Sequence, residues 1–226
     1  MPSIDILWQD DTVLAVNKPS GLLVHNSRYA GPKEYSLRQM VGEQLGHPVY
    51  PIHRLDRPTS GVLLFVKQRQ WAQPWHDQLT SASSRKTYLA LVRGHLTAPA
   101  MIDHPLKEGN VRREARSHVS LLLSSSVERC SLVQVQIETG RKHQVRRHLN
   151  HISHPIIGDT TYGKGAINRH YRAQYDLWRL ALHAWRLDII HPETDECLRL
   201  CAPLPDDLLS PLFALFPFAD LSQLEF

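Results

Sequence analysis

The segment HRLDRPTSG, residues 53–61, concentrates groups that could carry chemistry. One carboxylate, Asp56, lies between Arg54 and Arg57, with His53 nearby. Neighbouring cations favour the ionised form of a carboxylate, so Asp56 could act as a nucleophile or as a base. An aspartate that only pairs with adjacent arginines in a surface turn would have the same sequence, and such pairs contribute little. The spacing alone favours that plainer interpretation.

A second segment, GRKHQVRRH (140–148), lies where a helix is expected to begin and is rich in arginine and lysine. No Asp or Glu lies between Glu138 and Asp159, so this stretch is locally basic. Backbone N–H groups and cations at a helix start suit phosphate, and a solvated basic helix face explains the pattern equally well. In a third segment, KTYLA (86–90), Tyr88 could stack on a nucleobase, although most strand tyrosines are packing residues.

Metal and disulfide chemistry have weaker signals. Cys197 and Cys201 form a lone C-x3-C near His191, whereas zinc needs about four ligands, so we interpret both as small strand residues. Three cysteines, an odd number, argue against a secreted disulfide scaffold and favour a reducing cytoplasm. A metal-dependent phosphoesterase using His53 and Asp56 would need more carboxylates nearby than the segment offers. We expect no metal.

The hydrophobic pattern indicates the elements that must position these segments. Strands are expected at 4–8, 12–17, 22–25, 61–67, 87–93, 117–123, 132–137, 180–190 and 197–201. Helices are expected from the cap Ser36 to Gly46, over 70–80, over 142–152 and after Pro205. Strands outnumber helices and many connections are of hairpin length, so the sequence predicts an antiparallel α+β fold.

The composition is that of an ordinary globular protein. The chain has 226 residues and a mass of 25.9 kDa, with 42% hydrophobic and 21% charged residues. Its net charge of +4 is mild and does not by itself imply a nucleic-acid partner. The longest apolar runs, such as Val62 to Val66, are too short to cross a bilayer, and the acidic N-terminus has no signal-peptide pattern. We therefore expect no membrane association.

Five segments, in order, resemble the motifs of the RluA family of pseudouridine synthases. They are VLAVNKPSGLLVH (13–25), HRLDRPTSG (53–61), KTYLALVRG (86–94), TGRKHQVRRHLNHISHPIIGDTTYG (139–163) and RLALHAWRL (179–187). Within the family the chain is most similar to the TruC type, which modifies position 65 of tRNA. The features that carry this finer resemblance are Arg57-Pro58, Arg147-His148-Leu149, the run from His154 to Asp159, and Asn168-Arg169.

The chain also departs from the family. No S4-like RNA-binding domain precedes residue 4, the loop between Leu106 and Ser117 is shorter than is typical of the TruC type, and the tail past Pro205 is distinct. The resemblance thus implies one catalytic domain over 1–226, without an N-terminal S4-like domain. It implies a pseudouridine synthase fold with a long, mostly antiparallel sheet, flanking helices and a central cleft.

The resemblance implies a reaction without metal or cofactor. The N1–C1′ bond of uridine breaks, the base turns, and C5 joins C1′. Asp56 corresponds to the catalytic carboxylate, which either adds to C1′ or removes a proton from C2′. Tyr88 corresponds to the tyrosine that stacks on uracil and assists proton transfer near C5, and Arg146 to the arginine that pairs with the aspartate. Leu182 and His183 correspond to the floor of the uracil pocket, although both could be ordinary core residues.

The expected partner is RNA, with tRNA favoured and no protein partner implied. Arg54 would enter the RNA stack as the target base leaves. The whole set expected to contact RNA is Arg54, Arg57, Lys86, Arg141, Lys142, Arg147 and His148. Two alternatives stay open: a synthase of the same family that acts on rRNA, and a non-catalytic RNA-binding protein on the same scaffold. The latter would be expected to have lost Asp56, Tyr88 or Arg146.

Overall fold

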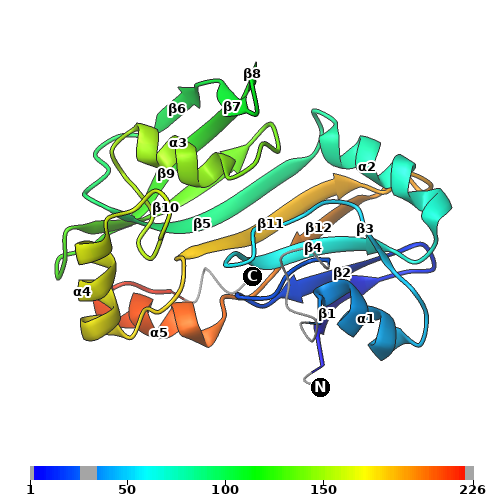
Figure 1. The fold of residues 1–226 in the computed structure, drawn as a ribbon, viewed down its shortest axis with the longest axis horizontal. Coiled ribbons are helices and arrows are strands. Elements are labelled where there is room, and N and C mark those ends of the chain that lie inside the picture. Colours follow the sequence, from blue (N-terminus) through cyan, green and yellow to red (C-terminus); the bar gives the residue numbers. More distant parts are fainter. Residues whose placement is uncertain (1–2, 26–34, 222–226) are drawn as a thin grey trace.

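A long twisted sheet dominates the computed structural model, which describes residues 3–25 and 35–221 (Figure 1). Within those ranges ten strands join in one sheet, in the order β1-β2-β4-β11-β5-β10-β9-β6, with β12 on β11 and β3 on β4. These strands are β1 (Asp5–Gln9), β2 (Val13–Lys18), β3 (Tyr50–Pro51), β4 (Ser60–Val66), β5 (Arg85–Arg93), β6 (Ala100–Asp103), β9 (Arg116–Ser124), β10 (Cys130–Ile137), β11 (Leu182–Ile190) and β12 (Cys197–Cys201). A separate hairpin pairs β7 (Leu106–Glu108) with β8 (Val111–Arg113).

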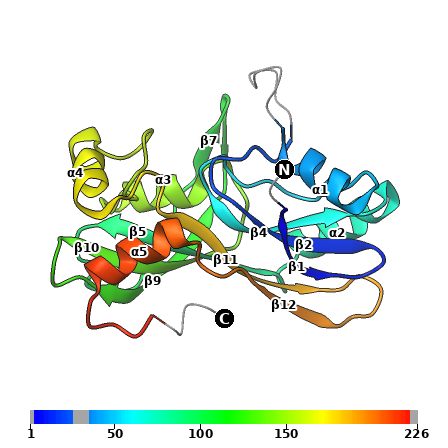
Figure 2. The same cartoon turned by 90° about the horizontal axis from the view of Figure 1, so that it is seen from below.

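Helices cover both faces of this sheet. They are α1 (Leu37–Leu45), α2 (Ala72–Thr80, after a 3-10 turn at Arg69–Trp71), α3 (Gln144–His151), α4 (Gly165–Tyr175) and α5 (Asp206–Leu215). Figure 2 shows α3 and α5 on opposite sides of the sheet. The predicted antiparallel α+β class is confirmed, since among the described strands only β4 and β11 pair in parallel.

The parallel pair brings the segment that follows Asp56 beside the closing motif. Ser60 lies opposite His183 and Gly61 opposite Ala184. Gly61 has a φ of 115°, and a Cβ placed there would come within 2.1 Å of the Ala184 carbonyl oxygen. Only glycine fits this close approach, because it tolerates positive φ and has no side chain.

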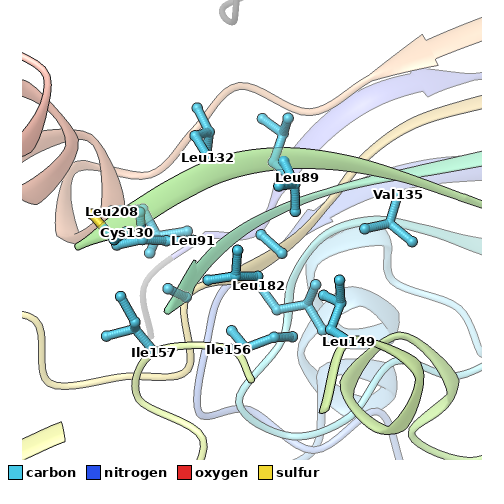
Figure 3. Packing of buried hydrophobic residues seen from close by; sticks show 14 of the residues in the cluster. Leu89, Leu91, Cys130, Leu132, Val135, Leu149, Ile156, Ile157, Leu182 and Leu208 are labelled. Atoms are coloured by element: carbon cyan, nitrogen blue, oxygen red, sulfur yellow. The ribbon is translucent and has the colours of Figure 1, made fainter. Parts of the chain in front are cut away.

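Strand alternation decides which residues reach which layer. On β5, Leu89 and Leu91 face the α5 side with Leu132 and Leu208, whereas Tyr88, one residue earlier, faces α3. Figure 3 shows part of this packing, with Leu149 of α3 near Val135 and Leu182. The two-residue period of the strand therefore carries Tyr88 to the layer that also holds α3.

Most of the predicted elements are present, with differences that have local causes. Residues 22–25 were expected to be a strand but form an irregular segment that ends in a bend, and the Leu23 carbonyl accepts the N–H of Leu37 at 2.8 Å. The helix expected from 142 begins at Gln144, because His143 adopts a left-handed conformation with a φ of 56°. The sequence did not predict β3, β6, β7, β8 or α4.

Two findings concern function classes. Cys197 and Cys201 lie at the ends of β12, and no group of three or more metal-ligating side chains is found in the described ranges. Among the helices described, none is long and apolar enough to cross a membrane.

Candidate active site

A single cavity gathers the three residues that the sequence singled out from distant segments. Asp56, Tyr88 and Arg146 all line it, with Leu182 of β11. The remaining lining residues are Arg54, Leu55, Thr59, Ile137, Gly140, Arg141, His143, Gln144 and Val145. The cavity lies where the segment 53–61, hereafter the Asp56 loop, meets β5 and the start of α3.

A buried lysine holds the Asp56 loop from behind. Lys18, at the end of β2, is fully buried, and its Nζ donates to the carbonyls of Pro19, Arg57 and Thr59 at 2.9, 3.0 and 2.8 Å. Burial lowers the pKa of Lys18 to about 7. The loop itself is closed by a hydrogen bond of 3.0 Å from the Thr59 N–H to the Asp56 carbonyl. The backbone around Asp56 is therefore fixed to β2.

A second buried cation ties the same loop to the far end of the chain. The Nη2 of Arg179 donates to Ser60 Oγ at 2.7 Å and to the Leu182 carbonyl at 3.1 Å, while Nη1 donates to Asp207 at 2.9 Å. Burial lowers the pKa of Arg179, and the Asp207 carboxylate opposes that shift. The loop is thus connected to β11 and to the first turn of α5.

Arg146 bridges two carboxylates inside the cavity wall. Its Nη1 donates to Asp56 Oδ2 at 3.0 Å, and its Nε and Nη2 donate to the two oxygens of Asp159 at 2.8 and 3.0 Å. The side chains of Arg146, Asp159 and Asp56 are 6%, 1% and 19% exposed. Such a pair can persist at this depth because each charge keeps several hydrogen bonds. The sequence indicated Arg146 and Asp56 but not Asp159, which holds the arginine in place.

Asp159 is itself fixed by the backbone. Its Oδ1 accepts the N–H groups of Thr161 and Tyr162 at 2.8 and 3.0 Å. Burial acts to raise the pKa of Asp159, but the hydrogen bonds from Arg146 and from this backbone outweigh it, so the pKa ends below its usual value. Burial likewise acts to lower the pKa of Arg146, yet the two carboxylates raise it. The arginine therefore stays charged.

Tyr88 and Leu182 form the apolar part of the cavity. Burial, together with the charge of Asp56, raises the pKa of Tyr88, so the phenol stays protonated. His183 does not line the cavity. It is buried behind the Asp56 loop, with Nδ1 2.8 Å from Ser60 Oγ and Nε2 3.0 Å from the Ala202 carbonyl. Burial lowers its pKa to about 4, so it is neutral.

A family model described as RNA pseudouridylate synthase matches residues 12–151, which contain Asp56, Tyr88 and Arg146. The chain belongs to this family. It is an RNA pseudouridine synthase, an isomerase that converts uridine to pseudouridine in RNA.

Named relatives agree over most of the chain. It is 39% identical over 224 residues to tRNA pseudouridine synthase C of Vibrio cholerae, an alignment that covers 90% of this chain and 92% of the relative. It is 40% identical over 221 residues to tRNA pseudouridine synthase C of Pasteurella multocida, covering 88% and 91%. Human RNA pseudouridylate synthase domain containing 1 has a similar fold, with a TM-score of 0.73 and 26% identity over 90% of this chain and 84% of that one.

The cations expected to bind RNA fall into two groups in this synthase. Arg54 and Arg141 line the cavity, where Arg141 Nε also donates to the Glu114 carbonyl at 2.9 Å, and Lys142 is exposed beside it. The others are engaged with the protein: Arg57 Nε donates to the Gly21 carbonyl at 2.8 Å, Lys86 Nζ to the Leu79 carbonyl at 2.9 Å, and Arg147 Nη1 to the Lys107 carbonyl at 3.2 Å.

His148 was expected to contact phosphate, and that prediction is wrong. The side chain is fully buried, with Nδ1 2.8 Å from Ser117 Oγ and Nε2 3.0 Å from the His104 carbonyl. Burial lowers its pKa, so it is a neutral part of the core of the synthase. The basic residues of this segment therefore do not all face solvent, because the face of α3 that carries His148 packs inward.

The phosphoesterase alternative finds no geometric support. His53 Nε2 accepts the N–H of Leu64 at 3.2 Å, and burial lowers its pKa to about 4. This nitrogen is committed to β4, and His53 does not line the cavity with Asp56. His143, which the sequence reasoning passed over, does line it. The sequence signal that could have indicated His143 was its position within the basic segment 140–148.

Proposed function

We propose that the protein converts uridine 65 of tRNA to pseudouridine in the cytoplasm, with Asp56 as the catalytic carboxylate. The observation that carries the proposal is the ion pair between Asp56 and Arg146 in a cavity that also holds Tyr88. The relatives named tRNA pseudouridine synthase C support tRNA as the substrate. The cysteines Cys130, Cys197 and Cys201 are free thiols, which is in keeping with a reducing compartment.

The reaction moves one proton and exchanges one bond. The N1–C1′ bond breaks, C5 bonds to C1′, the proton leaves C5 and N1 gains one, so no oxidant, reductant or cofactor is consumed. Arg146 occupies Oδ2 of Asp56, which leaves Oδ1 to act on the ribose. That oxygen either adds to C1′ or takes the C2′ proton. Both routes require an ionised carboxylate, which Arg146 stabilises in a site that excludes water once RNA is bound.

Tyr88 and Leu182 would hold the extruded uracil. The aromatic ring offers a stacking face, and the protonated phenol offers a hydrogen-bond donor near C5. Arg54, exposed at the same cavity, is placed to fill the position that the base leaves. Extrusion costs a few kcal/mol, and a replacement in the stack offsets part of that cost.

The test is a direct comparison of substrates. Purified protein is incubated with unmodified tRNA and with rRNA fragments, and pseudouridine is mapped in each product. Pseudouridine at position 65 of tRNA is the expected result. Product in rRNA alone would overturn the substrate while leaving the synthase activity intact, and RNA binding without product in either would favour the non-catalytic alternative.

A further inference from the structure

The two oxygens of Asp56 have different neighbours. Oδ2 accepts a hydrogen bond of 3.0 Å from Arg146, whereas Oδ1 lies 3.6 Å from Nε2 of His143. His143 lines the same cavity and is 23% exposed. The oxygen that remains to act on the ribose is therefore the one that faces an imidazole.

His143 occupies its place through an unusual backbone conformation. It precedes α3 with a φ of 56° and a ψ of 28°, a left-handed conformation that among non-glycine residues favours asparagine, aspartate and histidine. Ser153, Asp176 and Asp195 also have a positive φ, so this conformation explains where the imidazole lies, and its role follows from its contacts.

The other ring nitrogen is held by a tyrosine. His143 Nδ1 lies 3.1 Å from the hydroxyl of Tyr162, and the two rings meet edge to face at 5.8 Å. A carboxylate opposite Nε2 favours the tautomer with its proton on that nitrogen. The tyrosine hydroxyl then donates to Nδ1, and the Nε2 proton of His143 faces Asp56 Oδ1, 3.6 Å away and just beyond hydrogen-bond length.

One turn supports both partners of Asp56. Asp159 binds Arg146 and also accepts the Tyr162 N–H at 3.0 Å, while the Tyr162 ring lies against the Arg146 guanidinium at 5.2 Å from its centroid. The charged groups that act on His143 are Asp56, Arg146, Lys142 and Asp159. Burial outweighs the two carboxylates and lowers the pKa of His143, so the ring is neutral near pH 7 and turns an N–H toward Asp56 without adding charge.

We propose that His143, oriented by Tyr162, is a positioning residue that fixes the Asp56 oxygen not held by Arg146. With Oδ2 bound to Arg146 and Oδ1 facing the Nε2 proton of His143, rotation of the carboxylate about its Cβ–Cγ bond is restricted when the base leaves. Misplacement of a reacting group by about 1 Å can cost roughly 100-fold in rate. The proposal rests on the catalytic role of Asp56 stated above, and it is independent of which RNA is the substrate.

The experiment measures single-turnover rate at saturating RNA, RNA affinity and thermal stability for a set of variants. His143→Asn keeps a residue that tolerates the left-handed conformation and offers an amide N–H, whereas His143→Ala removes the donor. We expect a rate loss on the order of 100-fold for alanine and about 10-fold for asparagine, with affinity within twofold of the wild type. His76→Asn, an exposed histidine on α2, is the matched control and should leave all three values unchanged.

Tyr162→Phe separates positioning from folding, because it removes only the hydroxyl and keeps the ring on Arg146. If this hydroxyl acts only by orienting His143, the double variant Tyr162→Phe with His143→Ala should be no slower than His143→Ala alone. A wild-type rate in either His143 variant, or fully additive losses in the double variant, would overturn the proposal. An active Asp56→Asn variant would overturn both the role of His143 and the proposed function. A loss of rate in the His143 variants, combined with product only in rRNA, would leave the role of His143 intact and overturn only the tRNA substrate.

Discussion

The Asp56 loop and the β7–β8 hairpin (residues 106–113) both carry cations, but the two regions are held in opposite ways. The loop is fixed by Lys18 and Arg179, both buried cations that donate to its backbone or to Ser60. Most hairpin residues are exposed, and Figure 1 shows the hairpin projecting beyond α3 at the top of the view. Its hydrogen bonds to the helix segment include Glu108 accepting the Lys142 N–H at 2.9 Å and Lys107 accepting Arg147 at 3.2 Å.

This contrast separates two tasks. A carboxylate that reacts at one ribose carbon gains rate from a fixed geometry, which buried hydrogen-bonded cations provide. Cations that meet a flexible polyanion gain affinity from charge, which exposed side chains provide without a fixed position. Mutations should therefore change kcat and stability in the first region, and affinity and salt dependence in the second.

The largest effect is expected from Asp56→Asn, which keeps the size of the side chain and removes its charge. We expect pseudouridine formation to fall by at least about 10⁴-fold, because neither attack on C1′ nor removal of the C2′ proton is open to an amide. RNA affinity and thermal stability should stay close to wild type. Mapping of pseudouridine after long incubation measures the residual activity, and filter binding measures the RNA affinity. Turnover by this variant would show that the carboxylate is not the reacting group.

A smaller but still large effect is expected from Lys18→Met, which fills the same space without a donor. Three carbonyls of the loop region would lose a donor, of which the Arg57 carbonyl keeps the Gly21 N–H at 2.8 Å, and each buried group left unsatisfied costs about 1–3 kcal/mol. We expect the free energy of unfolding to fall by several kcal/mol and kcat to fall with it. Lys107→Met, on the exposed hairpin, is the control. Equal unfolding midpoints for both variants in denaturant would contradict the contrast between the two regions.

Substitutions in the β7–β8 hairpin should change RNA affinity and leave the catalytic rate unchanged. Replacing Arg112 and Arg113, both exposed on β8, with Gln removes two charges that could meet phosphates. We expect the slope of log affinity against log salt to flatten by roughly one to two charges, while the rate at saturating RNA stays unchanged. Titrations at several salt concentrations measure the slope. A loss of rate at saturating RNA, without a change in slope, would place the hairpin in the chemistry instead.

The sequence predicted the part of the fold that is set by local pattern. Alternating apolar residues in 132–137 identified β10, and the capping box of Ser36 with Gln39 identified the start of α1, where Gln39 Oε1 accepts the Ser36 N–H at 3.1 Å. Helix α4 is as amphipathic as α1, but its buried residues are Asn168 and Tyr171, so no stripe of aliphatic residues marks it. The strands of the β7–β8 hairpin are three residues each, too short for an alternating pattern to be recognised.

The sequence could not distinguish buried cations from exposed ones. Arg146 and His148 lie in one basic segment and both are buried, because Arg146 finds Asp56 and Asp159 and His148 finds Ser117. These partners are 13 to 90 residues away, so no local pattern reports them. Lys18 is similar: lysine is almost never fully buried unless it is paired, and its three carbonyl partners, two of them about 40 residues away, explain its burial here.

The smallest effect at neutral pH is expected from His183→Gln, behind the Asp56 loop. The amide N–H of glutamine can still donate to the Ala202 carbonyl, and Ser60 keeps its bond from Arg179, so the loss at pH 7 should be about 1 kcal/mol. In acid the variant should behave differently from the wild type. Burial lowers the pKa of His183 from 6.5 to about 4, so between these values the unfolded chain binds a proton that the folded chain does not.

The wild-type free energy of unfolding should therefore fall as pH drops from 6.5 to 4, with this histidine contributing up to about 1.4 kcal/mol per pH unit. His183→Gln should flatten the dependence by about one proton, whereas His95→Gln, at an exposed histidine, should leave it unchanged. Denaturant unfolding at a series of pH values measures both slopes. If His183→Gln and His95→Gln give the same pH dependence of the free energy of unfolding, His183 must be accessible to water in the folded protein. The segment behind the Asp56 loop would then be no more rigid than the exposed hairpin, which would contradict the contrast between the two regions.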